Sequence, residues 1–311
     1  MMTGSHARGG ILVTGGAGFI GSHVVNSLLT RRRDVHVLDN LTSGSLSNIT
    51  GDAVLHTGDI RSEVDVVSSI RAAEADVIVH CAAQTSVERS MKDREFDEAV
   101  NVSGTQVLLN AARSESVRRF IFLSSGGAIY GETEQPATEQ TSPAPRNFYG
   151  MHKLSAEEGV RAAGLPFAVI RPSNVYGPGQ RSDAEGGVLA IFCDRITANL
   201  PIEIHGAGQQ VRDFVYVSDL VEAVLLAISH PEDVIWNVSS GEATAIIDAA
   251  HMLGEQLGRK PEFVFKERRS GDVDRSVISP ALICSTGRWG PPLTLRDGLR
   301  RLVSNAATAP A

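Results

Sequence analysis

The chain has 311 residues, 42% of them hydrophobic and 21% charged, and a formal net charge of −7 at pH 7. This composition supplies enough apolar material for a packed core and excludes an intrinsically disordered chain. A mildly acidic protein lacks the positive field that attracts polyanions, so nucleic acids and anionic membranes are not expected as partners.

Six short apolar runs, rich in β-branched or aromatic residues, recur through the first 170 residues, and helix-like stretches separate most of them. The runs are Ile11–Val13, Val35–Leu38, Ala53–Leu55, Val77–Val79, Phe120–Leu123 and Phe167–Ile170. Continuous rather than alternating apolar character is typical of strands buried on both faces of a parallel sheet. The sequence therefore predicts an α/β fold with a doubly wound parallel (Rossmann) sheet.

The regular alternation weakens after about residue 175, at the breaker cluster Tyr176–Gly179. Beyond it we expect helices over Val188–Thr197 and about Ser218–Ser229, short strands, and a proline-rich tail. The length is consistent with two domains. We predict one domain over residues 10–175 and a smaller α/β domain over residues 176–311, with some segments returning to the first.

Three cysteines, Cys81, Cys193 and Cys284, are widely spaced and form no Cys-x-x-Cys pair. This pattern argues against a disulfide scaffold or a metal site and favours a reducing, cytoplasmic compartment. No apolar stretch approaches the roughly 18 residues that a membrane span needs. The polar start, residues 1–10, lacks the apolar core of a signal peptide.

Small or polar residues follow each apolar run. They are Thr14-Gly15-Gly16, Asp39-Asn40, Gly58-Asp59, His80–Ala83, Ser124-Ser125 and Arg171–Asn174. In an open parallel sheet, ligands bind beyond the carboxyl ends of the strands. The sequence therefore predicts a ligand site at this end of the sheet.

A glycine-rich loop follows the first predicted strand and opens a helix. Gly16, Gly18 and Gly21 satisfy G-x-G-x-x-G, which allows a tight turn, close approach to a pyrophosphate and close helix–strand packing. The helix N-terminus would then face the phosphates. Asp39 ends the next strand, where a carboxylate accepts both ribose hydroxyls and repels a 2′-phosphate. Loop and carboxylate together predict a dinucleotide site that prefers NAD to NADP.

Tyr149 and Lys153 are spaced i and i+4 in a stretch that Asn147 can begin, and Gly164 with Pro166 can end, as a helix. An ammonium near a phenol favours the phenolate and lowers the tyrosine pKa from its usual value of about 10. Tyr149 would then serve as a general base for a sugar or alcohol hydroxyl. In an arbitrary protein such a pair is more often two surface residues, so the rest of the chain decides.

The order of these motifs is that of extended short-chain dehydrogenases. They are Thr14–Gly21, Asp59, His80–Ala83, Ser124-Ser125 with Tyr130-Gly131, Tyr149-x-x-x-Lys153 and Arg212–Val217. From about residue 10 to about residue 305, the chain resembles the NAD-dependent nucleotide-sugar epimerase/dehydratase family, and within it the UDP-glucose 4-epimerases. Arg212–Val217 and Arg269–Asp272 narrow the resemblance to nucleotide-sugar enzymes.

The resemblance implies that residues 10–175 hold NAD, which stays bound, and that residues 176–311 mainly bind substrate. Tyr149 would take the proton from sugar O4 while C4 gives hydride to the nicotinamide, and hydride would return to the other face of the 4-keto intermediate. Lys153 would also hold the nicotinamide ribose. Relatives pair through helices near residues 91–113 and 147–163, so a homodimer is expected.

The resemblance also implies two sets of contacts. The cofactor would contact Gly15, Gly18, Phe19, Ile20, Gly21, Asp39, Asn40, Gly44, Asp59, Ile60, Ala82, Ala83, Gln84, Asn101, Tyr149, Lys153 and Ser173. The substrate would contact Ser125, Tyr149, Asn174, Val188, Arg212, Arg269, Asp272 and Ser276.

Gly126 departs from the family pattern, because many relatives have a catalytic Ser or Thr at this position. The supporting hydroxyl would have to come from Ser125, from Ser124 or from water. Either serine could instead only cap the strand end through local backbone hydrogen bonds. His152 also replaces a small residue common in relatives, and for an isolated histidine we expect a packing or surface role.

Gly127 and Ala128 separate rival activities. Sugar 4,6-dehydratases that resemble this fold have an Asp-Glu pair at these positions, and UDP-glucuronate decarboxylases have a Glu at the second. A 4-epimerase needs neither carboxylate, so we predict epimerisation, with a dehydratase or decarboxylase as the alternative. A nucleotide sensor of this fold is disfavoured because Tyr149 and Lys153 are both present.

Ser276 bears on the choice of sugar. In the 4-epimerases the residue at this position lies near the C2 substituent, where a bulky aromatic excludes N-acetyl sugars and a small residue admits them. We therefore expect UDP-N-acetylglucosamine as well as UDP-glucose to fit. A hexuronate such as UDP-glucuronate stays open, with Arg181 as a partner for its carboxylate.

Overall fold

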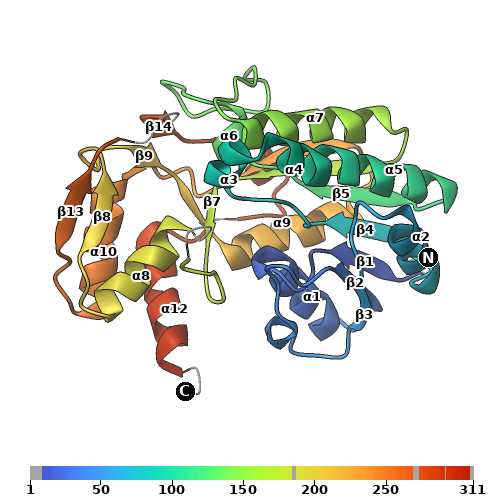
Figure 1. Cartoon of the computed structure of the whole chain (residues 1–311), viewed down its shortest axis with the longest axis horizontal. Coiled ribbons are helices and arrows are strands. Elements are labelled where there is room, and N and C mark those ends of the chain that lie inside the picture. Colours follow the sequence, from blue (N-terminus) through green and yellow to red (C-terminus); the bar gives the residue numbers. More distant parts are fainter. Residues whose placement is uncertain (1–8, 184–186, 269–272, 291, 309–311) are drawn as a thin grey trace. The chain divides into compact units, whose positions relative to one another are not determined.

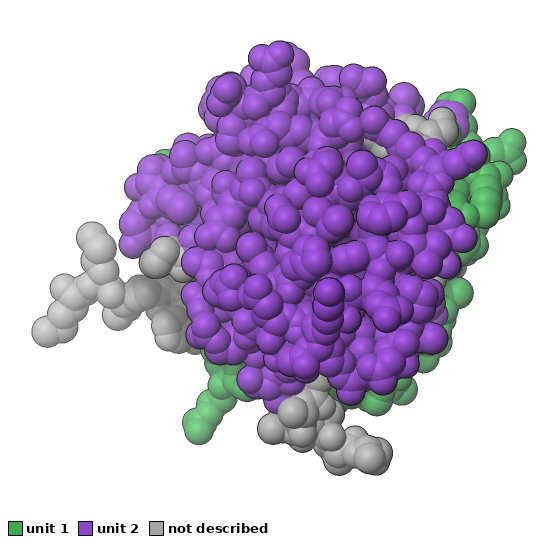
Figure 2. Space-filling model, turned by 90° about the vertical axis from the view of Figure 1, so that its left-hand side faces the viewer, with its two compact units in different colours: residues 1–124, 152–169, 224–234 green, residues 125–151, 170–223, 235–311 purple. Residues whose placement is uncertain are grey.

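The computed structural model describes residues 9–183, 187–268, 273–290 and 292–308. The chain divides into two compact units that alternate along the sequence (Figure 2). Unit 1 consists of Met1–Ser124, His152–Val169 and Val224–Val234. Unit 2 consists of Ser125–Met151, Ile170–Ala223 and Ile235–Ala311.

The largest sheet has seven strands in the order β11-β6-β5-β4-β1-β2-β3 (Figure 1). They are β1 (Ile11–Thr14), β2 (Val35–Asp39), β3 (Val54–Thr57), β4 (Val77–His80), β5 (Arg119–Leu123), β6 (Phe167–Pro172) and β11 (Val234–Val238). The pairs from β3 through β5 run parallel, and the chain changes direction across the sheet at β1. The predicted doubly wound parallel sheet is confirmed.

Most of the apolar runs identified in the sequence form strands that are buried inside the protein. Strands β1, β2, β4 and β5 are buried along their whole length. The prediction that every run is buried is wrong for β3, in which Val54 is 47% exposed. This strand pairs only with β2 and forms the sheet edge, so fewer neighbours cover it. It also begins one residue later than the apolar run suggested.

Helices cover both faces of this sheet, with α1 on one face and α5 on the other (Figure 1). The helices of this region are α1 (Phe19–Thr30), α2 (Glu63–Ala72), α3 (Val87–Lys92), α4 (Arg94–Glu98), a π-helix (Ala99–Gly104), α5 (Thr105–Ser114) and α7 (Phe148–Ala162); Leu46–Asn48 forms one 3₁₀ turn. Side chains cap several of them; Ser62, for example, accepts the backbone N–H of Asp65 at the start of α2.

Unit 2 contains three small sheets, ordered β10-β7, β12-β9-β14 and β13-β8. Its strands are β7 (Asn174–Tyr176), β8 (Ile202–His205), β9 (Val211–Arg212), β10 (Phe214–Tyr216), β12 (Thr244–Ala245), β13 (Phe263–Lys266) and β14 (Arg275–Ser276). Its helices are α6 (Gly126–Ile129), α8 (Val188–Thr197), α9 (Val217–Ser229, which ends in unit 1), α10 (Ile246–Leu257), α11 (Ala281–Ser285) and α12 (Leu295–Thr308). Tyr176, Phe192, Phe214, Leu253 and Leu299 lie in its core.

The predicted helix Val188–Thr197 is confirmed, and α9 begins one residue before the expected start. The proline-rich tail contains two helices, α11 and α12, that the sequence analysis did not predict. Pro280 and Pro292 precede these helices, where a missing N–H costs little. Leu295 and Leu299, one turn apart, bury the inner face of α12.

Candidate active site

The glycine loop connects β1 to α1 within unit 1. Gly15 has φ of +67°, a conformation that glycine adopts without strain. A Cβ on Gly15 would lie 2.6 Å from the backbone N of Ala82, and one on Gly21 would lie 2.1 Å from the carbonyl O of Gly15. Only glycine therefore allows α1 to begin this close to the sheet.

No side chain caps the N-terminus of α1, where Gly18 is the N-cap residue. Helix geometry leaves the first amide groups, which include Phe19 and Ile20, without an intrahelical acceptor. Gly44 lies close by, since a Cβ there would lie 2.8 Å from the carbonyl carbon of Ala17. The loop backbone thus forms a small cradle suited to an anionic group.

Asp39 ends β2 and is buried against this cradle. Its Oδ2 accepts the backbone N–H of Ala17 at 2.9 Å, and its Oδ1 accepts that of Leu41 at 2.8 Å. Each carboxylate oxygen can accept more than one hydrogen bond. Both oxygens therefore keep acceptor capacity for the two hydroxyls of a ribose.

Asp59 forms a two-point ion pair with Arg61, with Nε–Oδ1 at 2.9 Å and Nη2–Oδ2 at 2.8 Å. Asn40 donates to the same carboxylate at 3.1 Å. The guanidinium of Arg61 holds the pKa of Asp59 well below its usual range, so this carboxylate stays ionised. The neighbouring Ile60 is buried next to Gly104.

His80 connects the ends of three elements in unit 1. Its Nδ1 lies 2.7 Å from Oγ1 of Thr14 on β1, and its Nε2 lies 3.0 Å from Oγ1 of Thr105 on α5. Burial lowers the pKa of His80 to about 3, so the ring is neutral. Burial also raises the pKa of the Cys81 thiol to about 12, which leaves it unreactive.

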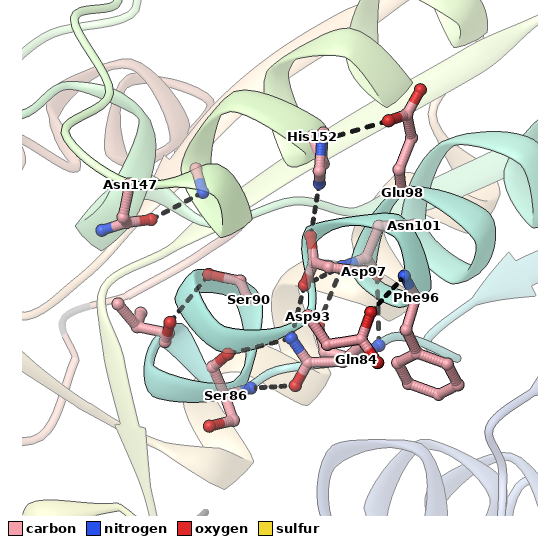
Figure 3. Close-up of polar contacts among 12 residues, drawn as sticks. Gln84, Ser86, Ser90, Asp93, Phe96, Asp97, Glu98, Asn101, Asn147 and His152 are labelled. Carbon is pink, nitrogen blue, oxygen red and sulfur yellow. Dashed lines mark hydrogen bonds and ion pairs between the residues drawn. The ribbon is translucent and has the colours of Figure 1, made fainter.

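Gln84 and Asn101 belong to a buried polar network in unit 1 (Figure 3). The backbone N of Gln84 donates to Oδ1 of Asn101 at 3.1 Å, and Asn101 Nδ2 donates to the Gln84 carbonyl at 2.9 Å. Both side chains also donate to Asp97. Ala82 and Ala83, on the segment that leads to Gln84, are half-buried.

His152 joins the same network, with Nδ1 2.5 Å from Oδ2 of Asp97. The expected packing or surface role missed this polar contact. Asp97 carries one sequence signal, because it stands four residues before Asn101 on a helical stretch and thus shares its face. Nothing in the sequence indicates that His152, 55 residues later, contacts it.

Helix α7 carries Tyr149 and, one turn later, Lys153. Lys153 is only 3% exposed, its Nζ donates to the Leu123 carbonyl at 2.6 Å, and the ammonium lies 4.2 Å from the centre of the Phe122 ring. Burial lowers the pKa of Lys153 to about 8, and the nearby Glu157 opposes this shift. At neutral pH Lys153 is therefore mostly a buried cation.

The predicted boundaries of this helix are confirmed. Oδ1 of Asn147 accepts the backbone N–H of Gly150 at 2.8 Å, as an N-cap residue does. The helix ends at Ala162, shortly before Gly164, which has φ of +68°.

The structure distinguishes the two candidate serines. The hydroxyl of Ser124 donates to the buried carboxylate of Glu157. Ser125 is the N-cap residue of α6, but its side chain makes no capping hydrogen bond. A Cβ on Gly126 would be crowded, because it would lie 2.6 Å from Cδ1 of Ile278 and 3.0 Å from the Arg171 carbonyl, so the end of the Ile278 side chain would have to move.

Unit 2 brings several of the expected substrate residues together. Arg212 on β9 is paired with Ser276 on β14. Oγ of Ser276 donates to the Gly127 carbonyl at 3.2 Å, and Asn174 Nδ2 donates to the Asp213 carbonyl at 2.9 Å. Gly127 and Asn174 also lie close together.

The remaining expected residues are more scattered. Val188 begins α8 and packs against the core of unit 2. Ser173 is buried, and its Oγ has no hydrogen-bond partner among the described residues. Arg181 is exposed and forms an ion pair with Asp183. Arg269 and Asp272 lie outside the described residues.

These features fit a dinucleotide such as NAD. The cradle is suited to an anionic group such as a pyrophosphate, and Asp39 keeps acceptor capacity for ribose hydroxyls. Within the described ranges, no group of three or more His, Cys, Asp or Glu side chains is arranged to hold a metal ion. None of the helices in the described part of the chain is long and apolar enough to cross a membrane.

Comparisons with known proteins identify the family of this chain. The sequence model for the "NAD dependent epimerase/dehydratase family" matches residues 11–239. The UDP-glucose 4-epimerase of Mycolicibacterium smegmatis is 33% identical over 308 residues, covering 94% of this chain and 96% of the relative.

Two solved structures extend the comparison. The UDP-glucose 4-epimerase of Thermus thermophilus, in complex with NAD, has 37% identity and a TM-score of 0.92, covering 96% of this chain and 99% of that one. The UDP-glucose 4-epimerase of Thermotoga maritima, with UDP-glucose, has 38% identity and a TM-score of 0.92, covering 96% and 98%. With a family match over most of its length and relatives above 30% identity, this chain belongs to the NAD dependent epimerase/dehydratase family.

Proposed function

We propose that the protein is an NAD-dependent UDP-sugar 4-epimerase that interconverts UDP-glucose and UDP-galactose. The observation that carries this proposal is the buried ammonium of Lys153, one helical turn after Tyr149. The similarity to 4-epimerases that bind NAD and UDP-glucose supports the same activity.

In this proposal the glycine loop, Asp39 and the polar groups that follow β3, β4 and β6 bind NAD. Bound NAD supplies the reversible oxidation of the sugar at C4. Unit 1 contributes most of these contacts: Gly15, Gly18, Phe19, Ile20, Gly21, Asp39, Asn40, Gly44, Asp59, Ile60, Ala82, Ala83, Gln84, Asn101 and Lys153. Ser173, with its unused hydroxyl, would complete the set.

Tyr149 moves the proton in this scheme. The positive charge of Lys153 favours the phenolate, so Tyr149 Oη can take the proton of sugar O4 during oxidation and return it during reduction. Lys153 is cationic at neutral pH because its pKa is about 8.

The supporting hydroxyl is assigned to Ser125. Ser124 already donates to Glu157, and Gly126 has no hydroxyl to offer. Ser125 is thereby the serine whose hydroxyl remains for the substrate oxygen. Ser124 would instead help to orient Glu157 next to Lys153.

Epimerisation is favoured over dehydration or decarboxylation. The additional acid or base that those reactions use is missing, because Gly127 and Ala128 occupy its positions. A dehydratase would release water and a decarboxylase would release carbon dioxide, whereas an epimerase leaves the mass of the nucleotide sugar unchanged.

For the substrate, Asn174, Val188 and Arg212 would bind the nucleotide end, together with Arg269 and Asp272. A small side chain at position 276 would leave space for an N-acetyl group, so we propose that UDP-N-acetylglucosamine is also accepted. Arg181 already has Asp183 as a partner, which weakens the case for a hexuronate. Turnover measured side by side on UDP-glucose, UDP-N-acetylglucosamine and UDP-glucuronate separates these substrates.

We also propose a homodimer formed through the helices near residues 91–113 and 147–163.

We further propose a cytoplasmic location. The three cysteines are free thiols, which suits a reducing compartment.

The test is turnover of UDP-galactose by the purified protein, followed by chromatography and mass measurement. We expect UDP-glucose of unchanged mass. Tyr149→Phe should lower kcat by about 10²- to 10⁴-fold because the proton acceptor is lost, with an unchanged melting temperature. Full turnover by this variant would contradict the assignment of Tyr149, and a product lighter by one water would indicate a dehydratase.

A further inference from the structure

A carboxylate that the scheme above does not use lies at the centre of the polar network in Figure 3. Asp97 is completely buried. Its Oδ1 accepts from Nε2 of Gln84 and from Nδ2 of Asn101, and its Oδ2 contacts Nδ1 of His152. A carboxylate oxygen accepts hydrogen bonds, so Nδ1 of His152 is the donor in this contact.

The network connects three separate segments of unit 1. Gln84 follows β4, Asn101 lies in the π-helix, and His152 lies on α7 directly before Lys153. A π-helix inside an α-helix often marks a functional site. The two amides that the scheme assigns to NAD and the helix that carries its proton-transfer pair therefore meet at one carboxylate.

The surroundings of His152 point to a specific role rather than to simple filling of space. The ring is buried, and its other nitrogen, Nε2, lies 4.0 Å from Glu98. A buried carboxylate that loses a donor keeps the cost of its removal from water. Without His152, Oδ2 of Asp97 would lose this donor.

We propose that His152 is a positioning residue. Through Asp97 it fixes the second turn of α7, and with it Lys153, relative to Gln84 and Asn101. This inference rests on the proposed function, because it assigns the cofactor to these two amides.

The test compares three variants of the NAD-loaded enzyme. His152→Leu keeps an apolar bulk but removes the donor. His152→Asn keeps an N–H donor at the same distance along the side chain as Nδ1 and removes Nε2. Asp97→Asn leaves His152 in place and removes one strong acceptor. His251→Leu, at an exposed position of α10 next to Phe263, is the matched control for adding a leucine.

The measurements are kcat, KM for UDP-galactose, the rate of NAD release and the melting temperature. A misplacement of the order of 1 Å can cost about 100-fold in rate, so His152→Leu and Asp97→Asn should lower kcat by about 10- to 100-fold. They should also release NAD faster, with little change in KM. His152→Asn should recover most of the lost activity, and His251→Leu should match the wild type.

Wild-type kcat and NAD release in His152→Leu would overturn the proposal. Equal losses in His152→Asn and His152→Leu would also overturn it, because the donor to Asp97 would then not matter. If His152→Leu does not fold, His152→Ser replaces it; serine is too short to reach Asp97, and a wild-type rate would again refute the proposal. A wild-type protein that neither retains NAD nor epimerises would instead refute the proposed function.

Discussion

At the scale of single residues, Lys153 combines burial with charge. Its pKa of about 8 means that the ammonium loses its proton in mildly alkaline solution. As pH rises through about 8, Tyr149 loses the positive charge that favours its phenolate, and we expect kcat to fall. A pH profile of kcat with saturating UDP-galactose measures this. A kcat that stays constant well above pH 8 would show that the charge of Lys153 is not needed.

The same shift predicts how stability depends on pH. The folded-state pKa of Lys153, about 8, lies below the ordinary lysine value of 10.5. The unfolded chain therefore binds more protons between these values, so this group's contribution to stability rises with pH in that window. Below pH 8 the buried charge costs about 3 kcal/mol.

Asp213 shows the opposite case. It is completely buried, its Oδ2 accepts the backbone N–H of Ile278 at 3.0 Å, and burial raises its pKa from 3.8 to about 6. Its folded-state pKa lies above the unfolded value, so its contribution to stability falls as pH rises from 3.8 to 6.

The variant Asp213→Asn should therefore be more stable than the wild type at neutral pH, by about 1–3 kcal/mol, since it buries no charge and keeps an acceptor for Ile278. Thermal unfolding on both sides of pH 6 measures this. The gain should disappear at acidic pH. A variant less stable than the wild type at neutral pH would mean that the ionised carboxylate itself stabilises the fold.

Residue types and spacing indicated Asp39, Tyr149 and Lys153, because each motif lies within one short segment. The contacts of other residues around the site could not be predicted in this way. Glu157 meets Ser124, and Asp97 meets His152, only because α7 packs beside segments that are distant in the sequence.

At the scale of elements, the beginning of α1 depends on the lack of a side chain at Gly21. For Gly21→Ala we expect loss of NAD binding and a lower melting temperature, because its Cβ would lie 2.1 Å from the Gly15 carbonyl. Gly159→Ala in α7 is the control. Its Cβ would lie 3.5 Å from Gln106 and 3.7 Å from Leu109, so it should stabilise the helix by about 0.5–1 kcal/mol. Equal effects of the two substitutions on NAD retention would contradict this account.

Elements with a strong periodic or apolar pattern were predictable, as Val188–Thr197 illustrates. Two features were not predicted: the exposure of strand β3 and the presence of helix α12. Strand β3 contains an apolar run but lies at the sheet edge. Helix α12, which the sequence analysis did not predict, follows Pro292, and proline is tolerated before the first turn of a helix.

At the scale of the whole molecule, the two units exchange the chain several times, inside α7, β6, α9 and β11. Sequence patterns indicate where a helix or strand begins and ends. They do not indicate that the two halves of one helix or strand belong to different compact units. The change in pattern near Tyr176 could therefore suggest a boundary, while the return of residues 224–234 to unit 1 needed the structure.

The proposed homodimer makes a prediction for the whole molecule. Light scattering should give a mass of about twice the 33.1 kDa of one chain, since the proposed contact uses the helices near residues 91–113 and 147–163 of both copies. A mass near that of a single chain, at the concentrations used for activity assays, would exclude the dimer.

The crowding at Gly126 restricts how this site could change over evolutionary time. The Cβ of a serine introduced there would lie 2.6 Å from Cδ1 of Ile278, so the Ile278 side chain would have to move, and shortening it, for example to valine, would remove this contact. The effects of the two substitutions are therefore expected to be non-additive, with Gly126→Ser tolerated better when residue 278 is already valine. A smaller residue at position 278 would thus make it easier for the supporting hydroxyl to move from position 125 to position 126 during evolution.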